Sequence, residues 1–345
     1  MTLPPDAPVR SVEIDLVLAP PPDPSLEPEG FLAGAGGARV HFLDWGGPDD
    51  GPGVLLVPGL LSPAWSWAPV ARRLARARRT CVMDLRGHGL SDAPPDGYDL
   101  ATLAEDAALV AEASGVAGAS GRVVLAGHGF GACVAAAAAA AMGERCAGLV
   151  LVDGGIERLA ETADLDADEL LRSLDEPPAV LRSMDAWLAD RRGFDEASWD
   201  ADQERAARDA VVATAAGHLV RAVRPFAVAA LASTVLAYDP ADVLSRVSAP
   251  VVALVAMAAG DPAPRLAELR RAGAARVAAG LEPIGVIGLP YAAHNLPRYR
   301  PAEVTAAILG AAGLFRAATN STRRTDPGVA CRSGSPPERH EPSRP

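Results

Sequence analysis

The stretch most informative about chemistry is VLAGHGFGACVAAAAAAAM, at positions 124–142. Its pattern predicts a buried strand, a glycine-rich turn and an alanine-rich helix. This is the setting of the G-x-S-x-G motif, in which a serine on a sharp strand-to-helix turn acts as a nucleophile. Here the middle position is Gly129. Because an acyl-enzyme mechanism needs a side-chain nucleophile there, ordinary serine-esterase chemistry is not expected.

Strands and helices alternate on both sides of this turn. The strands are apolar, and each ends at a glycine or in a short turn, which is typical of a parallel sheet covered by helices on both faces. The sequence therefore predicts an α/β fold with a mostly parallel, doubly wound sheet. The strands are expected at 53–59, 80–87, 122–127, 147–155, 249–257 and 284–290.

The alternation is interrupted once. Residues 156–247 are helical in pattern and charged, with no convincing buried strand, which favours a helical cap inserted into the core. The ends of the chain are rich in proline and polar residues. The expected organisation is a flexible arm at 1–30, a core at 31–155 and 248–316, the cap at 156–247, and a disordered tail at 317–345.

Five short motifs then occur in a recognisable order. They are VPGL at 57–60, DLRGHGLSD at 84–92, GHGFG at 127–131, DP at 261–262 and AHNLPRYRP at 293–301. Each is weak alone, but their order over roughly residues 38–314 resembles the alpha/beta-hydrolase superfamily. The similarity is to its esterase, haloperoxidase and lactonase branch, whose members carry a helical cap.

The resemblance implies a set of site residues. His294 matches the family's general base, and Asp261 matches the acid that orients it, with Asp153 at the end of the preceding core strand as the alternative. The backbone N–H groups of Leu60 and Phe130 match the two donors of an oxyanion hole. Pro58 stands where many relatives have histidine, which affects loop shape more than chemistry.

Other polar and aromatic residues are candidates for the walls of a pocket. His128, beside the turn, is expected to support it rather than to ionise in catalysis. Trp65 and Trp67 follow the oxyanion loop and could line the pocket, although their spacing also suits core packing. Cys133 and Ser62 are the nearest alternative nucleophiles, but the first is expected to be buried and the second lies on the wrong side for His294.

Two functions of different kinds remain open. In the first, His294 and its acid act as a general base on water or on the substrate, giving an ester or lactone hydrolase or a lyase. In the second, the protein is a pseudo-hydrolase that binds a small ligand without chemistry. A formerly active esterase that lost its serine is a variant of the second. The ligand is expected to be small and mainly apolar in either case.

Composition narrows the range of partners. The formal net charge of −11 argues against nucleic acid or an anionic membrane as the main partner. The four cysteines lack metal-ligand spacing, and no G-x-G-x-x-G motif is present, so neither metal nor dinucleotide is expected. The amino-terminal sequence does not resemble a signal peptide, and the apolar run at 123–142 is interrupted by glycines. A cytoplasmic protein is therefore expected, with its oligomeric state open.

Overall fold

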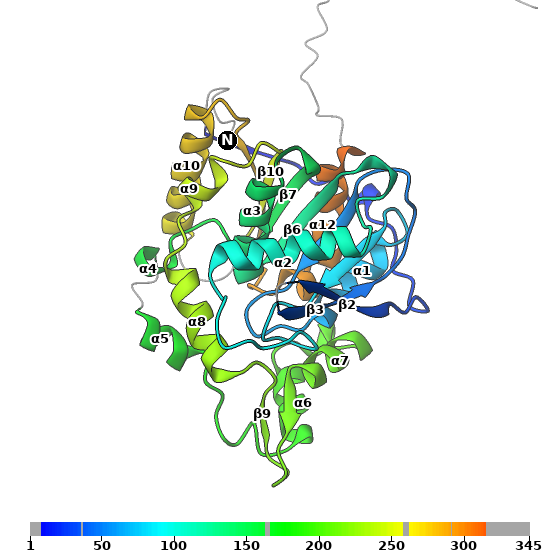
Figure 1. Ribbon diagram of the computed structural model, residues 1–345, viewed down its shortest axis with the longest axis vertical. Helices are drawn as coiled ribbons and strands as arrows, with labels where there is room; N and C mark the ends of the chain where they lie inside the picture. Colours follow the sequence, from blue (N-terminus) through cyan, green and yellow to red (C-terminus); the bar gives the residue numbers. More distant parts are fainter. Residues whose placement is uncertain (1–7, 36, 163–165, 258–261, 291, 315–345) are drawn as a thin grey trace, which may run out of the picture. The chain divides into compact units, whose positions relative to one another are not determined.

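A nine-stranded sheet forms the centre of the protein. The computed structural model describes residues 8–35, 37–162, 166–257, 262–290 and 292–314. The strand order is β1-β11-β10-β7-β6-β4-β5-β3-β2 (Figure 1). The strands are β1 (Val9–Ser11), β2 (Glu29–Ala35), β3 (Ala38–Asp44), β4 (Gly53–Val57), β5 (Thr80–Met83), β6 (Val123–His128), β7 (Cys146–Val152), β10 (Val251–Ala256) and β11 (Ile284–Leu289).

The sheet is parallel except at one edge, as the alternation of strands and helices predicts. β3 runs antiparallel to both β5 and β2, while β1, β11, β10, β7, β6, β4 and β5 form a parallel series. The carboxyl ends of β4, β6, β7, β10 and β11 consequently meet at one edge of the sheet. Loops that leave this edge from different strands can therefore bring distant residues together.

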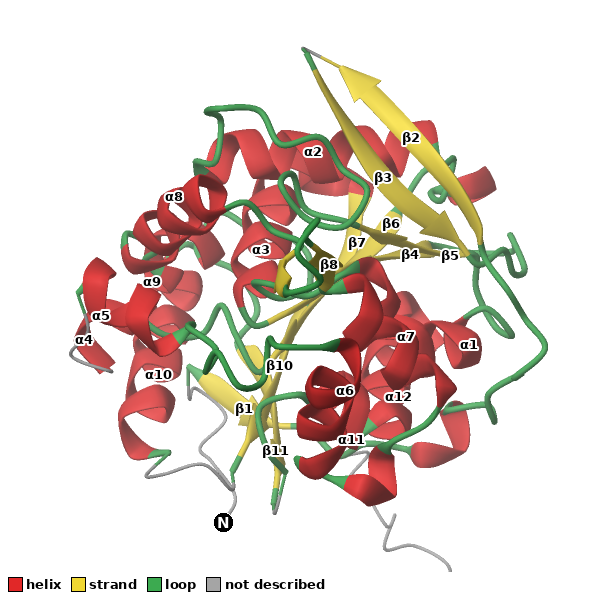
Figure 2. Ribbon diagram, turned by 90° about the horizontal axis from the view of Figure 1, so that it is seen from below, coloured by secondary structure: helices red, strands yellow, loops and turns green. Residues whose placement is uncertain are grey.

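Two hydrophobic cores lie on the two faces of the sheet. Alternate strand residues point to opposite faces, so Leu55 belongs to one core while Val54 and Leu56 belong to the other. The first core contains residues of α2 (Leu100–Ala113), α3 (Phe130–Met142), α9 (Pro240–Leu244) and α10 (Ala263–Ala278). The second contains residues of α1 (Ala68–Leu74) and α12 (Pro301–Leu309). Figure 2 shows the strands lying between these two sets of helices.

The amino-terminal stretch is more closely attached than the sequence suggested. β1 pairs in parallel with β11, through Val9 and Ile284 among others. The Arg72 guanidinium donates hydrogen bonds to the backbone carbonyls of Asp23, Pro24 and Leu26, and Arg73 donates to the carbonyl of Pro20. β1 is followed by a short 3-10 helix, Leu16–Leu18. Residues 8–30 are thus tied to the core, and residues 317–345 lie outside the described part.

The segment inserted between β7 and β10 is mainly helical, with one exception. It contains α4 (Leu159–Thr162), α5 (Ala167–Ser173), α6 (Met184–Gly193), α7 (Ala201–Asp209) and α8 (Pro225–Leu236). Between α7 and α8, β8 (Val211–Ala213) and β9 (Leu219–Arg221) form an antiparallel hairpin that the sequence analysis did not predict. The hairpin lies at the lower end of the view in Figure 1. Its strands are too short and too exposed to resemble core strands.

No helix within the described ranges is both long and apolar enough to span a membrane. The alanine-rich helix α3 illustrates the reason. It has only 13 residues, about 20 Å at 1.5 Å per residue, and it packs in the core beside β6.

Candidate active site

The turn between β6 and α3 has the sharp geometry that the motif predicted. Gly129 adopts φ 54° and ψ −123°, a backbone conformation that strongly favours glycine. The adjoining glycines are required by close packing. A Cβ atom on Gly127 would lie 2.1 Å from the carbonyl oxygen of Gly131, and one on Gly131 would lie 2.3 Å from that of Pro58. β6, α3 and the loop that follows β4 (residues 58–62, the oxyanion loop) therefore approach one another closely at this point.

His294 lies on the loop that follows β11 and faces the turn. The Nε2 atom of His294 is 3.3 Å from the position that a Cβ atom would occupy on Gly129. The other ring nitrogen, Nδ1, is 2.7 Å from Oδ2 of Asp153, which comes directly after β7. With Nδ1–H donating to the carboxylate, Nε2 carries the free lone pair. The His294 side chain is 62% exposed, so a ligand or water can reach this nitrogen.

Asp153 is the acid that the structure places beside His294. Its side chain is only 2% exposed, and its backbone has a positive φ of 47°. The order of motifs favoured Asp261, which lies outside the described residues. Because Nδ1 of His294 is already bound to Asp153, the described geometry favours Asp153 as the acid that orients the histidine. Both acids follow the ends of neighbouring strands, β7 and β10, which explains why sequence alone left two candidates.

The environment of Asp153 keeps its carboxylate ionised. Burial alone would raise the pKa of Asp153, but the hydrogen bond with His294 and the positive charge of Arg265 outweigh it and lower that pKa. Oδ1 accepts hydrogen bonds from Ala256 N at 2.8 Å and from Arg265 Nη2 at 2.9 Å. Sequence analysis did not identify Arg265, because 112 residues separate it from Asp153.

The two backbone donors expected to form an oxyanion hole have no partner within the described part of the fold. Within the described residues, neither the N–H of Leu60 nor that of Phe130 has a hydrogen-bond partner. The N–H of the next residue, Leu61, donates to Nε2 of His88 at 3.2 Å. His88 donates from Nδ1 to the carbonyl of Arg86, and burial lowers the pKa of His88, which favours its neutral form. His88 thus holds the loop that presents the Leu60 donor.

His128 supports the loop that carries His294, in agreement with the structural role expected for it. Its Nε2–H donates to the carbonyl oxygen of His294 at 2.9 Å, and the two ring centroids are 4.6 Å apart. Burial, followed by the neighbouring His294, lowers the pKa of His128 to about 3. His128 is therefore neutral in the folded protein and does not line the cavity described below.

The two tryptophans pack in the core and are not pocket residues. Trp67 is fully buried in the second core, and Trp65 is 3% exposed. Trp65 packs against Trp45 and donates from Nε1 to Asp202 of α7, while the Arg205 guanidinium lies 3.5 Å from its ring centroid. Trp65 therefore attaches the inserted segment to the core, and Trp67 fills the second core, which suits the helical spacing seen in the sequence.

A cavity of about 530 Å³ lies next to the oxyanion loop. Leu61 contributes from the core, and the other walls come from α5, α8, β9 and their adjoining loops. Seven of the eleven lining residues are apolar, and four are charged. The lining residues are Leu61, Asp168, Leu171, Arg172, Leu174, Asp175, Arg221, Val223, Pro225, Val228 and Ala229. This size and lining suit a small ligand.

Neither of the alternative nucleophiles is suitably placed. Cys133 is buried, and burial raises the pKa of its thiol to about 12, so the reactive thiolate is negligible near neutral pH. Ser62 donates its backbone N–H to Gly59 within the oxyanion loop, and no hydrogen bond links its hydroxyl to His294. No cluster of three metal-binding side chains occurs in the described ranges.

The glycine turn and the His–Asp pair, on a mostly parallel sheet covered by helices, are the features of one fold family. The chain belongs to the alpha/beta hydrolase family, whose model matches residues 54–308. This confirms the fold class that the order of motifs predicted.

Individual relatives share this fold and part of the sequence. N-formylmaleamate deformylase of Pseudomonas putida is 41% identical over 128 residues, 36% of this chain and 46% of that protein. 2-(Acetamidomethylene)succinate hydrolase of Mesorhizobium japonicum is 34% identical over 119 residues, 34% of this chain and 41% of that protein. The matched stretch thus spans less than half the length of these curated relatives.

A solved structure extends the similarity over the whole fold. The crystal structure of E-2-(acetamidomethylene)succinate hydrolase superimposes with a TM-score of 0.67. The alignment covers 82% of this chain and 98% of that one, at 24% identity. At this level of identity the comparison shows the shared fold, and the chemistry has to be argued from the site itself.

Proposed function

We propose that this protein hydrolyses a carbonyl compound, with His294 as a general base that activates water directly. The observation that carries the proposal is the 3.3 Å between Nε2 of His294 and the Cβ position of Gly129. In a serine hydrolase the nucleophilic oxygen would stand between these groups. Glycine leaves room there for about one water molecule beside a free ring nitrogen and backbone donors.

The proposed reaction follows from these positions. The water oxygen attacks the carbonyl carbon, and its proton passes to Nε2 of His294. The N–H groups of Leu60 and Phe130 stabilise the negative charge that develops on the carbonyl oxygen. The protonated ring then donates its proton to the departing oxygen or nitrogen, which releases an acid and an alcohol or amine. Asp153 stabilises the transient imidazolium through Nδ1–H.

The substrate is proposed to be small and mainly apolar. The cavity beside Leu61 supports this, because seven of its eleven lining residues are apolar. An ester, a lactone or an amide would each offer the required carbonyl group. The names of two relatives, a deformylase and a hydrolase of an acetamidomethylene compound, favour an N-acyl group as the first class to assay. In a lyase reaction, His294 would instead remove a proton from the substrate itself.

The experiment compares the native protein with His294→Gln on short p-nitrophenyl esters and small N-formyl and N-acetyl amides. The variant is expected to lose about 10²- to 10⁴-fold in kcat/KM while unfolding at the same temperature. His218→Gln, in the turn between β8 and β9, is the matched control and should keep full activity.

Two further outcomes separate this mechanism from its alternatives. A native enzyme of this kind shows no burst of product and no inhibition by a serine-directed sulfonyl fluoride, because no acyl-enzyme forms. If the native protein turns over none of these compounds yet binds their product acids by calorimetry, the ligand-binding pseudo-hydrolase is the correct interpretation. Activity that survives His294→Gln would overturn the general-base mechanism.

A further inference from the structure

An arginine stands behind the His–Asp pair. Arg265, in the first turn of α10, donates from Nη2 to Oδ1 of Asp153 at 2.9 Å and from Nε to Oε1 of Glu157 at 2.8 Å. Its side chain is mostly buried, so solvent screens these interactions only partly. One guanidinium therefore joins two carboxylates, and one of these carboxylates also accepts from His294.

We propose that Arg265 is a positioning residue for the active site, which fixes the Asp153 carboxylate and sets the pH range in which His294 accepts a proton. This inference deepens the proposed function of the same site. A carboxylate beside histidine favours the imidazolium, and an arginine on that carboxylate opposes this effect.

The geometry supports both parts of the proposal. The planar guanidinium binds Asp153 and Glu157 at once, which a lysine ammonium cannot match in direction. Oδ1 of Asp153 is saturated by Arg265 and Ala256 N, so only Oδ2 is left to orient the His294 ring. The carboxylates also raise the pKa of Arg265 despite its burial, so that its charge persists throughout the working pH range.

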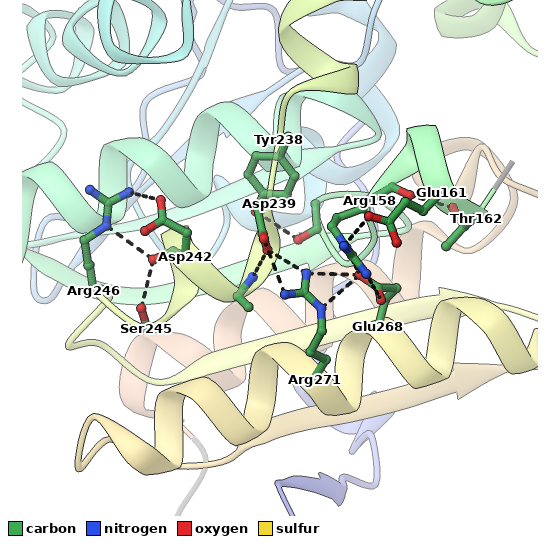
Figure 3. A network of polar contacts seen from close by, with 12 residues as sticks. Arg158, Glu161, Thr162, Tyr238, Asp239, Asp242, Ser245, Arg246, Glu268 and Arg271 are labelled. Atoms are coloured by element: carbon green, nitrogen blue, oxygen red, sulfur yellow. Dashed lines mark hydrogen bonds and ion pairs between the residues drawn. The ribbon is translucent and has the colours of Figure 1, made fainter. Parts of the chain in front are cut away.

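The helix that carries Arg265 is itself anchored. Glu268 and Arg271 follow at intervals of three residues on α10 (Figure 3). Glu268 accepts from Arg158 at 2.8 and 2.9 Å, and Arg271 donates to Asp239 at the start of α9 at 2.6 Å. The ion pair of Arg158 with Glu268 therefore holds α10 against the loop that follows β7, whereas Arg271 holds α10 to α9.

The charged and titratable groups around His294 come from four parts of the fold. Asp153 follows β7, Glu157 lies in the next loop, Arg265 is on α10, and His128 ends β6. His128 is neutral at working pH, because its pKa is lowered to about 3. Removal of the Arg265 charge and removal of the Glu157 charge should therefore shift the titration of the His294–Asp153 pair in opposite directions.

The test follows the ring protons of His294 by NMR as a function of pH, with the resonance assigned by its loss in His294→Gln. In Arg265→Gln the midpoint of this titration should move up by about one pH unit. Without the arginine charge, the His294 ring beside Asp153 should bind its proton more tightly. In Glu157→Gln the midpoint should move down. A residue that only stabilised the fold would not produce shifts of opposite sign.

Matched variants separate charge from folding. Arg271→Gln removes an arginine from the same helix that also binds two carboxylates but does not contact Asp153, so it should leave the midpoint unchanged. Arg265→Lys should recover most of the shift, because it restores the charge. If Arg265→Gln does not fold, Arg265→Lys and Glu157→Gln still carry the test. An unchanged midpoint in folded Arg265→Gln, or an equal shift in Arg271→Gln, overturns the inference.

Activity provides a second readout that distinguishes this inference from the proposed function. The acid limb of the kcat/KM profile should move with the NMR midpoint, and kcat should fall while KM changes little. If the midpoint shifts but no variant, nor the native protein, has activity, the proposed function fails and the role of Arg265 stands. If activity is present and both profiles are unchanged in Arg265→Gln, the role of Arg265 fails alone.

Discussion

The Nε2 atom of His294 and the α-carbon of Gly129 face each other across a gap that one side chain would fill. A Cβ atom on Gly129 would have His294 Nε2 as its nearest neighbour at 3.3 Å, with the α-carbon of Gly59 next at 3.9 Å outside the histidine ring. The pair therefore retains the relative placement of base and nucleophile, although the nucleophile is absent. This relationship leads to the first prediction.

Gly129→Ser should create a serine nucleophile in contact with His294. The variant is expected to react covalently with a sulfonyl fluoride and to release p-nitrophenol in a burst, whereas the native protein does neither. Its stability should fall by about 1–3 kcal/mol, because serine must adopt φ near 54°. Mass spectrometry and urea unfolding measure the two effects. Gly129→Ala is the control: it has the same strain but should not be labelled.

Asp153→Asn should remove the orienting carboxylate while keeping its size. We expect kcat to fall by roughly 10²- to 10⁴-fold, because the neutral amide stabilises neither the required tautomer nor the imidazolium. Stability should fall by about 3 kcal/mol or less, since Arg265 keeps Glu157 as a partner. Asp261→Asn is the comparison and should retain activity. The reverse result would transfer the role to Asp261.

His128 should contribute to acid destabilisation. Its pKa is lowered from 6.5 to about 3, so the unfolded chain binds a proton below pH 6.5 that the folded protein does not. The contribution of this histidine to the free energy of unfolding is therefore fully present above pH 6.5. It is lost as the pH falls toward 3, at up to about 1.4 kcal/mol per pH unit. His128→Gln keeps a donor for the His294 carbonyl but cannot titrate. Urea unfolding between pH 7 and 4 should show a shallower slope for this variant, and equal slopes would contradict the prediction.

The buried thiols should take no part in catalysis. Burial raises the pKa of Cys81 and Cys133 to about 12 and that of Cys146 to about 11. A Cys331→Ser protein retains only the three buried thiols. A thiol reagent at pH 8 should therefore react with them no faster than the protein unfolds. Cys133→Ala should keep kcat within about twofold of the native value. A large loss of kcat in a stable Cys133→Ala protein would identify it as a nucleophile.

Much of the site could be predicted because its parts are local. The turn at Gly129 follows from a strand pattern, a run of glycines and a helix pattern within twenty residues, and His294 lies in a similarly continuous motif. The candidate oxyanion donors were inferred for the same reason, since each is a backbone group close to a strand end, and their role stays a prediction. Local patterns of this kind survive in a single sequence.

The acid could not be chosen in this way. Asp153 and Asp261 both follow strands of the same parallel sheet, so either carboxylate could reach the edge where His294 lies. The choice depends on loop conformation, including the positive φ of Asp153, which no composition predicts for a non-glycine residue. Arg265 was missed because a guanidinium that contacts a distant carboxylate has no local pattern.

The inserted segment shows the same limit. Its hairpin, β8 and β9, has strands of three residues, too short for their alternation to stand out from the surrounding helices. Gly217, with φ 82° in the connecting turn, was the one local indication. The spacing of Trp65 and Trp67 allowed both a core and a pocket position and slightly favoured the core, where their burial places them.

The close packing of glycines around the turn also bears on how this protein can evolve. Gly127, Gly131 and Gly154 leave no space for larger residues, since a Cβ on Gly154 would lie 2.1 Å from the carbonyl oxygen of Gly129. Position 129 differs, because its Cβ would meet no atom closer than 3.3 Å. Some glycine codons become serine codons by a single base change. A lineage that carries one of these codons at position 129 is therefore a single base change from a serine beside His294, without any rebuilding of the fold.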